Sequence, residues 1–228
     1  MRNKSVLLLA CIFLIAGLTF GRGMVIVEAE QPAQGECVVE ISSRRILHAK
    51  NASLPLANAS TTKIMTALVI LEDCPLDDKV TIPAEAAGVE GSSVYLRAGE
   101  EYTVEELLYG LMLRSGNDAA VALALHHSGS IAAFAQVMNE RAILLGATDS
   151  CFVNPHGLPD ERHHTTARDL ALISAAAMEN ETFRTIVSTR CYAPRDWYNK
   201  NKLLSSYEGA CGVKTGYTMQ AGRCLVSA

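Results

Sequence analysis

Residues 60–71 read STTKIMTALVIL, and this stretch predicts the element at the centre of the fold. Apolar residues recur in it three and four positions apart, and further apolar residues occupy the remaining faces. This pattern predicts a helix that is buried on nearly every side, at the centre of a domain. Ser60 opens the helix, where free backbone N–H groups and the positive end of the helix dipole favour negative charge.

Ser60 and Lys63 form the only Ser-x-x-Lys pattern in the chain. Residues three apart on a helix share a face, so the Lys63 ammonium can reach the Ser60 hydroxyl. A lysine in apolar surroundings near a second cation binds its proton weakly and can act as a general base. The pair is a candidate nucleophile and base, although so short a pattern also arises by chance between ordinary residues of a helix start.

Strands and helices surround this central helix in a definite order. Two strands joined by a tight turn are expected at 36–42 and 45–49, with further strands at 190–193, 209–214 and 224–227. Helices are expected at 104–113, 118–127, 131–145 and 166–178. Strands at both ends with helices between them predict an α/β domain of the α+β kind. We expect its N-terminal strands to meet the C-terminal ones in a mainly antiparallel sheet.

A second motif, Ser115-Gly116-Asn117, lies between two expected helices. Its hydroxyl can relay a proton and its amide can hold a substrate amide, because side chains two apart on a turn can point the same way. On its own it reads equally as a helix–helix turn that Asn117 caps.

A third motif, Lys214-Thr215-Gly216, follows a strand-like run. Lysine and threonine offer a cation and a hydroxyl to a carboxylate, and glycine lets a ligand lie close to the backbone. Alone, it is also compatible with a strand end that carries a solvated lysine.

The three motifs occur once each and in this order, as they do, with Ser-Asp-Asn in the middle, in class A β-lactamases and penicillin-binding proteins. Longer stretches narrow the match: 59–68 (ASTTKIMTAL), 113–120 (LRSGNDAA), 154–158 (NPHGL), 165–170 (TTARDL) and 214–218 (KTGYT). On these residues, the chain from about 36 to 228 resembles the serine-type D-alanyl-D-alanine carboxypeptidases, a family of low-molecular-mass penicillin-binding proteins.

The resemblance implies a β-lactamase/penicillin-binding-protein transpeptidase-like fold: an antiparallel sheet flanked by helices, plus an all-helical lobe, with the site in the cleft between them. It also implies that Ser60 attacks the carbonyl between the last two D-alanines of a peptidoglycan stem peptide, with Lys63 as its base. D-alanine leaves, and water hydrolyses the acyl-enzyme. By the same likeness Ser115 relays protons and Asn117 holds the peptide.

The remaining roles also come from the resemblance. Lys214 and Thr215 would bind the terminal carboxylate, and Gly216 belongs to the same substrate-binding strand. The oxyanion hole would be the backbone N–H groups of Ser60 and Tyr217. β-Lactam antibiotics are the expected inhibitors, and no metal or cofactor is expected.

Family members usually continue past the Lys-Thr-Gly strand with more of the sheet and a closing helix. Many then carry a second domain and a C-terminal amphipathic helix on the membrane. None of these follows Lys214 here, nor does the second carboxylate-binding arginine of the family. We therefore expect residues 30–228 to be a catalytic domain that is incomplete at its C-terminus, with any membrane contact made through a missing tail.

Other functions fit less well. A class A β-lactamase needs a carboxylate that activates the deacylating water, usually within Glu-x-x-x-Asn, and no glutamate ahead of the third motif has that context. A binding module that only senses peptidoglycan would be expected to lack Ser60 or Lys63. A metal hydrolase would be expected to show His-Glu-x-x-His, which the six histidines do not form.

The N-terminus predicts export. A short basic segment, residues 1–4, precedes an uncharged apolar stretch at 6–20 and a small-residue cleavage site near Ala29. The apolar stretch is shorter than the roughly 20 residues of a membrane-spanning helix. We expect residues 1–29 to be a signal peptide and the mature protein to act outside the cytoplasm.

Composition is consistent with this interpretation. The chain of 228 residues is 49% hydrophobic with a net charge of −4, which excludes a disordered protein and provides no basic surface for nucleic acid. Six cysteines would remain after cleavage. They could form three disulfides, but their irregular spacing favours small apolar residues in strands.

Overall fold

The computed structural model describes residues 33–228, so the predicted signal peptide lies outside the described residues. One compact unit, Gln34–Ala228, contains every helix and strand that the structure describes. In chain order these are β1 (Glu36–Val39), β2 (Ile46–Lys50), the 3-10 helix η1 (Ala59–Thr62), α2 (Lys63–Asp73), β3 (Lys79–Thr81), β4 (Glu101–Thr103), α3 (Val104–Leu113), α4 (Asn117–Ser128), α5 (Ile131–Leu144), α6 (Ala167–Ala177), α7 (Glu181–Ser188), β5 (Cys191–Tyr192), η2 (Ala193–Arg195), β6 (Trp197–Tyr198), α8 (Leu203–Ser206), β7 (Val213–Thr218) and β8 (Gly222–Ser227).

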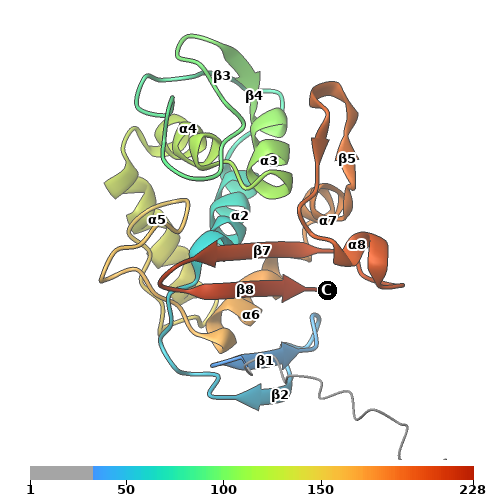
Figure 1. The fold of residues 1–228 in the computed structure, drawn as a ribbon. Helices are drawn as coiled ribbons and strands as arrows, with labels where there is room; N and C mark the ends of the chain where they lie inside the picture. Colours follow the sequence, from blue (N-terminus) through green and yellow to red (C-terminus); the bar gives the residue numbers. More distant parts are fainter. Residues whose placement is uncertain (1–32) are drawn as a thin grey trace, which may run out of the picture. The chain divides into compact units, whose positions relative to one another are not determined.

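Helix α2 is the buried central helix that the sequence predicts. Every residue from Lys63 to Ile70 is buried. Helices α3, α4, α5, α6 and α7 all contact it, and Figure 1 shows it (cyan) among them. Since fully burying a leucine or isoleucine side chain stabilises by about 1.5–3 kcal/mol, this helix anchors the fold.

The strands form four two-stranded antiparallel sheets among the described residues: β1–β2, β3–β4, β5–β6 and β7–β8. The expected joining of N-terminal and C-terminal strands is therefore wrong within 33–228. Strand β1 packs on α6, whereas β7 and β8 pack on η1, and Figure 1 draws the two hairpins as separate ribbons. The α+β class itself is confirmed.

Helix ends follow local capping chemistry. Helix α3 spans the predicted 104–113, because Thr103 caps it and Glu106 completes a capping box. Strand β7 begins later than predicted, at Val213, and extends to Thr218. The hairpin β3–β4 was not predicted, because its strands are three residues long and only Val80 and Tyr102 point inward.

Two further observations concern residues 33–228. No single helix there is long and apolar enough to cross a membrane, and one bent pair, α4 with α5, reaches that length and composition across an 85° break. None of the six cysteines in this part of the chain forms a disulfide.

Candidate active site

Ser60 lies in the 3-10 turn η1, directly before α2, and is partly exposed. The turn requires an unusual backbone at Ala59, whose φ is +47°. Gly157 lies so close that a Cβ added there would fall 1.8 Å from the Ala59 carbonyl oxygen. The approach of Gly157 thus packs a distant loop directly against the turn that carries Ser60.

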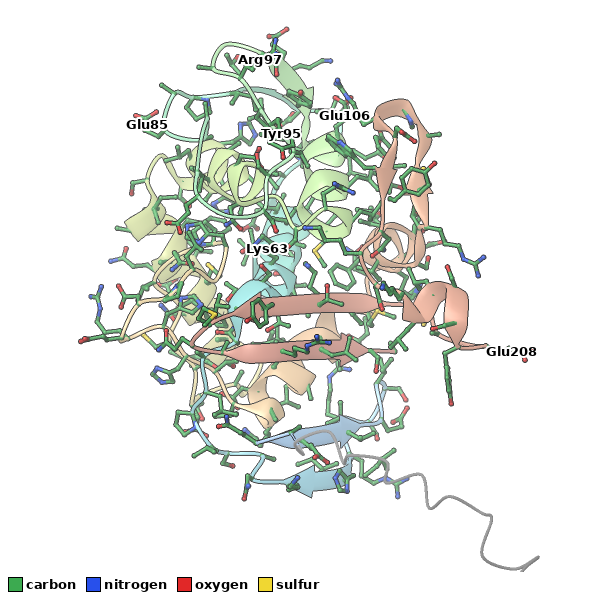
Figure 2. The ribbon with its side chains drawn as sticks, in the orientation of Figure 1. Lys63, Glu85, Tyr95, Arg97, Glu106 and Glu208 are labelled. Atoms are coloured by element: carbon green, nitrogen blue, oxygen red, sulfur yellow. The ribbon has the colours of Figure 1, made fainter. Side chains whose placement is uncertain are left out.

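Lys63 has three polar contacts. Its Nζ lies 3.1 Å from Ser60 Oγ, 2.7 Å from Asn117 Oδ1 and 2.7 Å from the carbonyl oxygen of His156. The side chain is fully buried, and Figure 2 labels it on α2. Lys63 therefore reaches the Ser60 hydroxyl, as the sequence predicts.

The surroundings of Lys63 favour its neutral form. Burial, and after it the positive charges of Lys214 and Lys200, hold the pKa of Lys63 well below its usual value, while Asp118 raises it. A neutral lysine has two N–H groups and one lone pair. The two carbonyl oxygens can only accept, so they take the N–H groups and leave the lone pair for the Ser60 hydroxyl proton.

Asn117 opens helix α4 and is buried. Its Nδ2 donates to the carbonyl oxygen of Glu90 at 2.6 Å, and its backbone N–H donates to that of Ser92 at 2.7 Å. Gly91 must be a glycine, because its φ is +90° and a Cβ there would lie 2.8 Å from Asn117 Nδ2. The loop of residues 88–96 therefore fixes the Asn117 amide, whose oxygen holds Lys63.

Ser115 has a strained backbone with a φ of +64° and is buried. Its Oγ has no hydrogen-bond partner among the described residues. A buried hydroxyl without a partner is costly unless something else binds it. The structure thus presents an unsatisfied hydroxyl two residues before Asn117.

Asp118 holds the 88–96 loop in place. Its carboxylate accepts hydrogen bonds from the Ser93 hydroxyl at 2.5 Å and from the backbone N–H groups of Val94 and Leu96 at 3.0 and 3.1 Å. The side chain is fully buried. Sequence reasoning assigned Asp118 no role, since its partners are mostly backbone groups of a distant loop.

Strand β7 contributes the third motif. Lys214 is buried, its Nζ donates to the Thr215 carbonyl oxygen at 2.8 Å, and burial followed by the charge of Lys200 lowers its pKa to about 7. A Cβ on Gly216 would lie 3.1 Å from the Ser60 backbone nitrogen. The strand backbone therefore passes beside Ser60, and the side chain of Tyr217 is exposed.

Lys200 was missed by sequence analysis. Its backbone N–H donates to the Leu113 carbonyl oxygen at 3.1 Å, and its Nζ donates to Ser92 Oγ at 3.0 Å. Its charge reaches both buried lysines of the site. The only signal in the sequence is the pair of asparagines around it, of which Asn201 donates to the Gly212 carbonyl oxygen at 2.9 Å.

No metal site accompanies this arrangement: within residues 33–228, no group of three or more His, Cys, Asp and Glu side chains is placed to hold a metal ion. The six histidines form no such cluster. What the structure brings together is a serine, two buried lysines, an amide and an unsatisfied hydroxyl.

Comparison with known proteins decides the family. Residues 24–228 match the model of the D-alanyl-D-alanine carboxypeptidase family. The chain belongs to this family. It is 38% identical over 212 residues to the D-alanyl-D-alanine carboxypeptidase DacF of Bacillus subtilis, and 42% identical over 206 residues to the D-alanyl-D-alanine carboxypeptidase of Streptomyces sp. strain K15.

A solved structure agrees with the fold. The Streptomyces K15 DD-transpeptidase superposes with a TM-score of 0.79 at 37% identity, covering 87% of this chain and 86% of that one. The fold that the family resemblance implies is thereby confirmed. The matches cover 88% and 80% of this chain, but 54% of the Bacillus carboxypeptidase and 71% of the Streptomyces one, so the chain spans about half of its Bacillus relative.

Proposed function

We propose that the chain carries the catalytic part of an exported serine carboxypeptidase that removes the terminal D-alanine from peptidoglycan stem peptides. Family membership and the names of its relatives support the reaction class. Export is inferred from the signal-like residues 1–29, and places the enzyme where peptidoglycan is accessible.

One observation carries the proposal: the hydrogen bonding of Lys63. Its two shorter contacts, 2.7 Å each, go to oxygens that can only accept, and its third contact is the Ser60 hydroxyl. A neutral amine held in this way directs its lone pair at that hydroxyl. Lys63 is the general base of the mechanism and Ser60 the nucleophile.

The first chemical step forms an acyl-enzyme. Ser60 Oγ bonds to the carbonyl carbon between the last two D-alanines while its proton passes to Lys63 Nζ. The C–N bond then breaks, and the leaving D-alanine nitrogen takes a proton that Ser115 relays from Lys63. The unpartnered Ser115 hydroxyl supports this relay, because the substrate would supply the partner it lacks.

Two negative charges on the substrate are stabilised at separate places, the terminal carboxylate and the oxyanion that forms during attack. The terminal carboxylate binds near Lys214 and Thr215, where the positive charge of Lys200 adds to that of the Lys214 ammonium. The oxyanion is stabilised by the backbone N–H groups of Ser60 and Tyr217. A Cβ added to Gly216 would lie 3.1 Å from the Ser60 backbone nitrogen, so the strand that carries Tyr217 passes close to that nitrogen. This closeness supports an oxyanion hole made of the two N–H groups. Asn117 holds the peptide amide.

Water completes the cycle by hydrolysing the ester, which returns the proton to Ser60 and releases the shortened peptide. Penicillin takes the place of the substrate in the acylation step. It acylates Ser60, and the resulting acyl-enzyme is hydrolysed slowly. The chain lacks the Glu-x-x-x-Asn context that drives release in a class A β-lactamase.

The proposal is tested by incubating the chain with a peptide that ends in D-Ala-D-Ala and measuring released D-alanine. Wild type should release it, and Ser60→Ala should not. Ser188→Ala, which alters an exposed serine on α7, is the matched control and should match wild type. Release by Ser60→Ala at the wild-type rate would contradict the proposal.

A further inference from the structure

His163 is a buried titratable side chain that the proposed mechanism does not use. It directly precedes His164, which forms an isolated bridge with Cys151, and only 5% of it is exposed. Its Nδ1 accepts the backbone N–H of Val153 at 3.1 Å, and its Nε2 lies 2.8 Å from Thr62 Oγ1. Both ring nitrogens thus have a partner.

These contacts define the tautomer. A nitrogen that accepts a backbone N–H carries no proton, so in the neutral ring the proton is on Nε2 and is donated to Thr62. Burial lowers the pKa of His163 to about 4, with Asp160 raising it and His164 lowering it. The ring is therefore neutral near pH 7, with one accepting and one donating side.

The donating side reaches the catalytic turn. Thr62 lies between Ser60 and Lys63 in sequence and is fully buried. Its Oγ1 also accepts from Asn58 Nδ2 at 2.8 Å, so the hydroxyl is held from two directions. Any shift of Thr62 would move the neighbouring Lys63 relative to Ser60.

The accepting side reaches a second element, the 153–157 loop (residues 153–157, VNPHG). Its first N–H is the one that His163 accepts. Further along, the Pro155 carbonyl oxygen accepts from Thr66 Oγ1 at 2.7 Å, and the His156 carbonyl oxygen accepts from Lys63 Nζ at 2.7 Å. The loop thus supplies one of the two carbonyl oxygens that orient the lysine.

We propose that His163 is a positioning residue, whose ring fixes the catalytic turn against the 153–157 loop through Thr62 and so sets the contact between Lys63 and Ser60. The inference rests on the proposed function of those two residues. A misplacement of about 1 Å in a reacting group can cost about a hundredfold in rate. A ring that only filled the core, packed edge-on against Phe152 at 5.7 Å, would affect folding but not the rate of the folded protein.

The test separates rate from folding by following acylation with a fluorescent penicillin. The burst amplitude reports the fraction of folded protein, and the concentration dependence gives the acylation rate constant and the dissociation constant of the first complex. Lys214, Thr215 and Asn117 bind the ligand from other elements, so loss of the Thr62 contact should change the rate constant and leave the dissociation constant within about twofold.

Two pairs of variants test the bond from its two ends. Thr62→Val keeps the shape but removes the hydroxyl that contacts both His163 and Asn58, whereas Thr62→Ser keeps that hydroxyl. His163→Asn keeps an acceptor for Val153 and removes the donor to Thr62, whereas His164→Asn alters the neighbouring histidine. Thr62→Val and His163→Asn should each slow acylation by about ten- to a hundredfold, and both controls should match wild type.

The double variant Thr62→Val/His163→Asn should be no slower than the slower single variant, because both remove the same bond. Wild-type rate constants in both single variants would overturn the inference. So would a loss confined to the burst amplitude, including a Thr62→Val chain that fails to fold while Thr62→Ser folds. If wild type is not acylated at all, the proposed function fails instead.

Discussion

Lys63 Nζ lies 3.1 Å from Ser60 Oγ and is 0.4 Å closer to each of two carbonyl oxygens, at 2.7 Å. The two oxygens come from different parts of the chain, one from the Asn117 side chain at the start of α4 and one from the His156 backbone. Together they dictate which way the amine points. The amine is thus oriented before any substrate arrives, which is the preorganisation that the proposed base would need.

Replacing Lys63 by arginine keeps hydrogen-bond donors and removes the base. The guanidinium has several N–H groups, but it does not lose a proton at working pH. We expect Lys63→Arg to lower the rate of acylation by about 10²–10⁴-fold, the usual contribution of a general base. Fluorescent penicillin labelling measures this rate. Lys202→Arg, at an exposed lysine, should keep the wild-type acylation rate. An acylation rate for Lys63→Arg within tenfold of wild type would show that Lys63 is not the general base.

Lys214 should make stability depend on pH. Its pKa is about 7 in the folded chain, against 10.5 for an ordinary lysine, so between these values the unfolded chain binds more protons. Stability must then rise with pH above 7, by up to about 1.4 kcal/mol per pH unit for one proton.

The measurement is urea unfolding at pH 7.0, 7.75 and 8.5 for wild type and Lys214→Met. The free energy of unfolding of wild type should rise more steeply with pH than that of Lys214→Met, because only wild type gains from losing that proton. Equal slopes for the two proteins would show that Lys214 titrates normally.

Gly157 should tolerate no side chain. A Cβ there would fall 1.8 Å from the Ala59 carbonyl oxygen, so Gly157→Ala must push the catalytic turn or the 153–157 loop away. We expect acylation to fall at least about a hundredfold. Gly129→Ala is the matched control, because Gly129, at the C-terminal end of α4, also has a positive φ, +71°, and nothing within 4 Å of an added Cβ. It should lose only about 1 kcal/mol of stability and keep its acylation rate.

Asp118 should support ligand binding through the 88–96 loop. In Asp118→Asn the amide NH2 must face a backbone N–H: that of Ala119 if the amide oxygen takes the place of Oδ2, or that of Leu96 if it takes the place of Oδ1, at a cost of about 1–3 kcal/mol. Thermal unfolding should show this loss, and the dissociation constant for penicillin should rise as Asn117 loosens. The exposed Asp77→Asn provides the comparison, and equal melting temperatures for the two variants would contradict this role.

The sequence predicts the parts of this site that depend on local structure. Ser60 and Lys63 share one turn of a helix, and the helix is recognisable from its apolar residues alone. The Lys-Thr-Gly and Ser-Gly-Asn motifs could be found for a similar reason: each is a short run of side chains with its own chemistry.

Two groups near Lys63 could not be predicted in the same way. One is the backbone carbonyl of His156, and every residue has such a carbonyl, so no residue type marks it. Lys200 reaches the site because asparagines on either side bind distant carbonyl oxygens, a tertiary effect. The pairing of the strands was also wrongly expected, because strand-like residues at both ends of a chain do not say which edges meet.

The most direct test of the account is mass spectrometry of the chain after brief exposure to penicillin. The account predicts a mass increase equal to one intact penicillin on each folded chain, located by peptide mapping on Ser60 and absent from Ser60→Ala. A label on any other residue, or an equal label on Ser60→Ala, would contradict it.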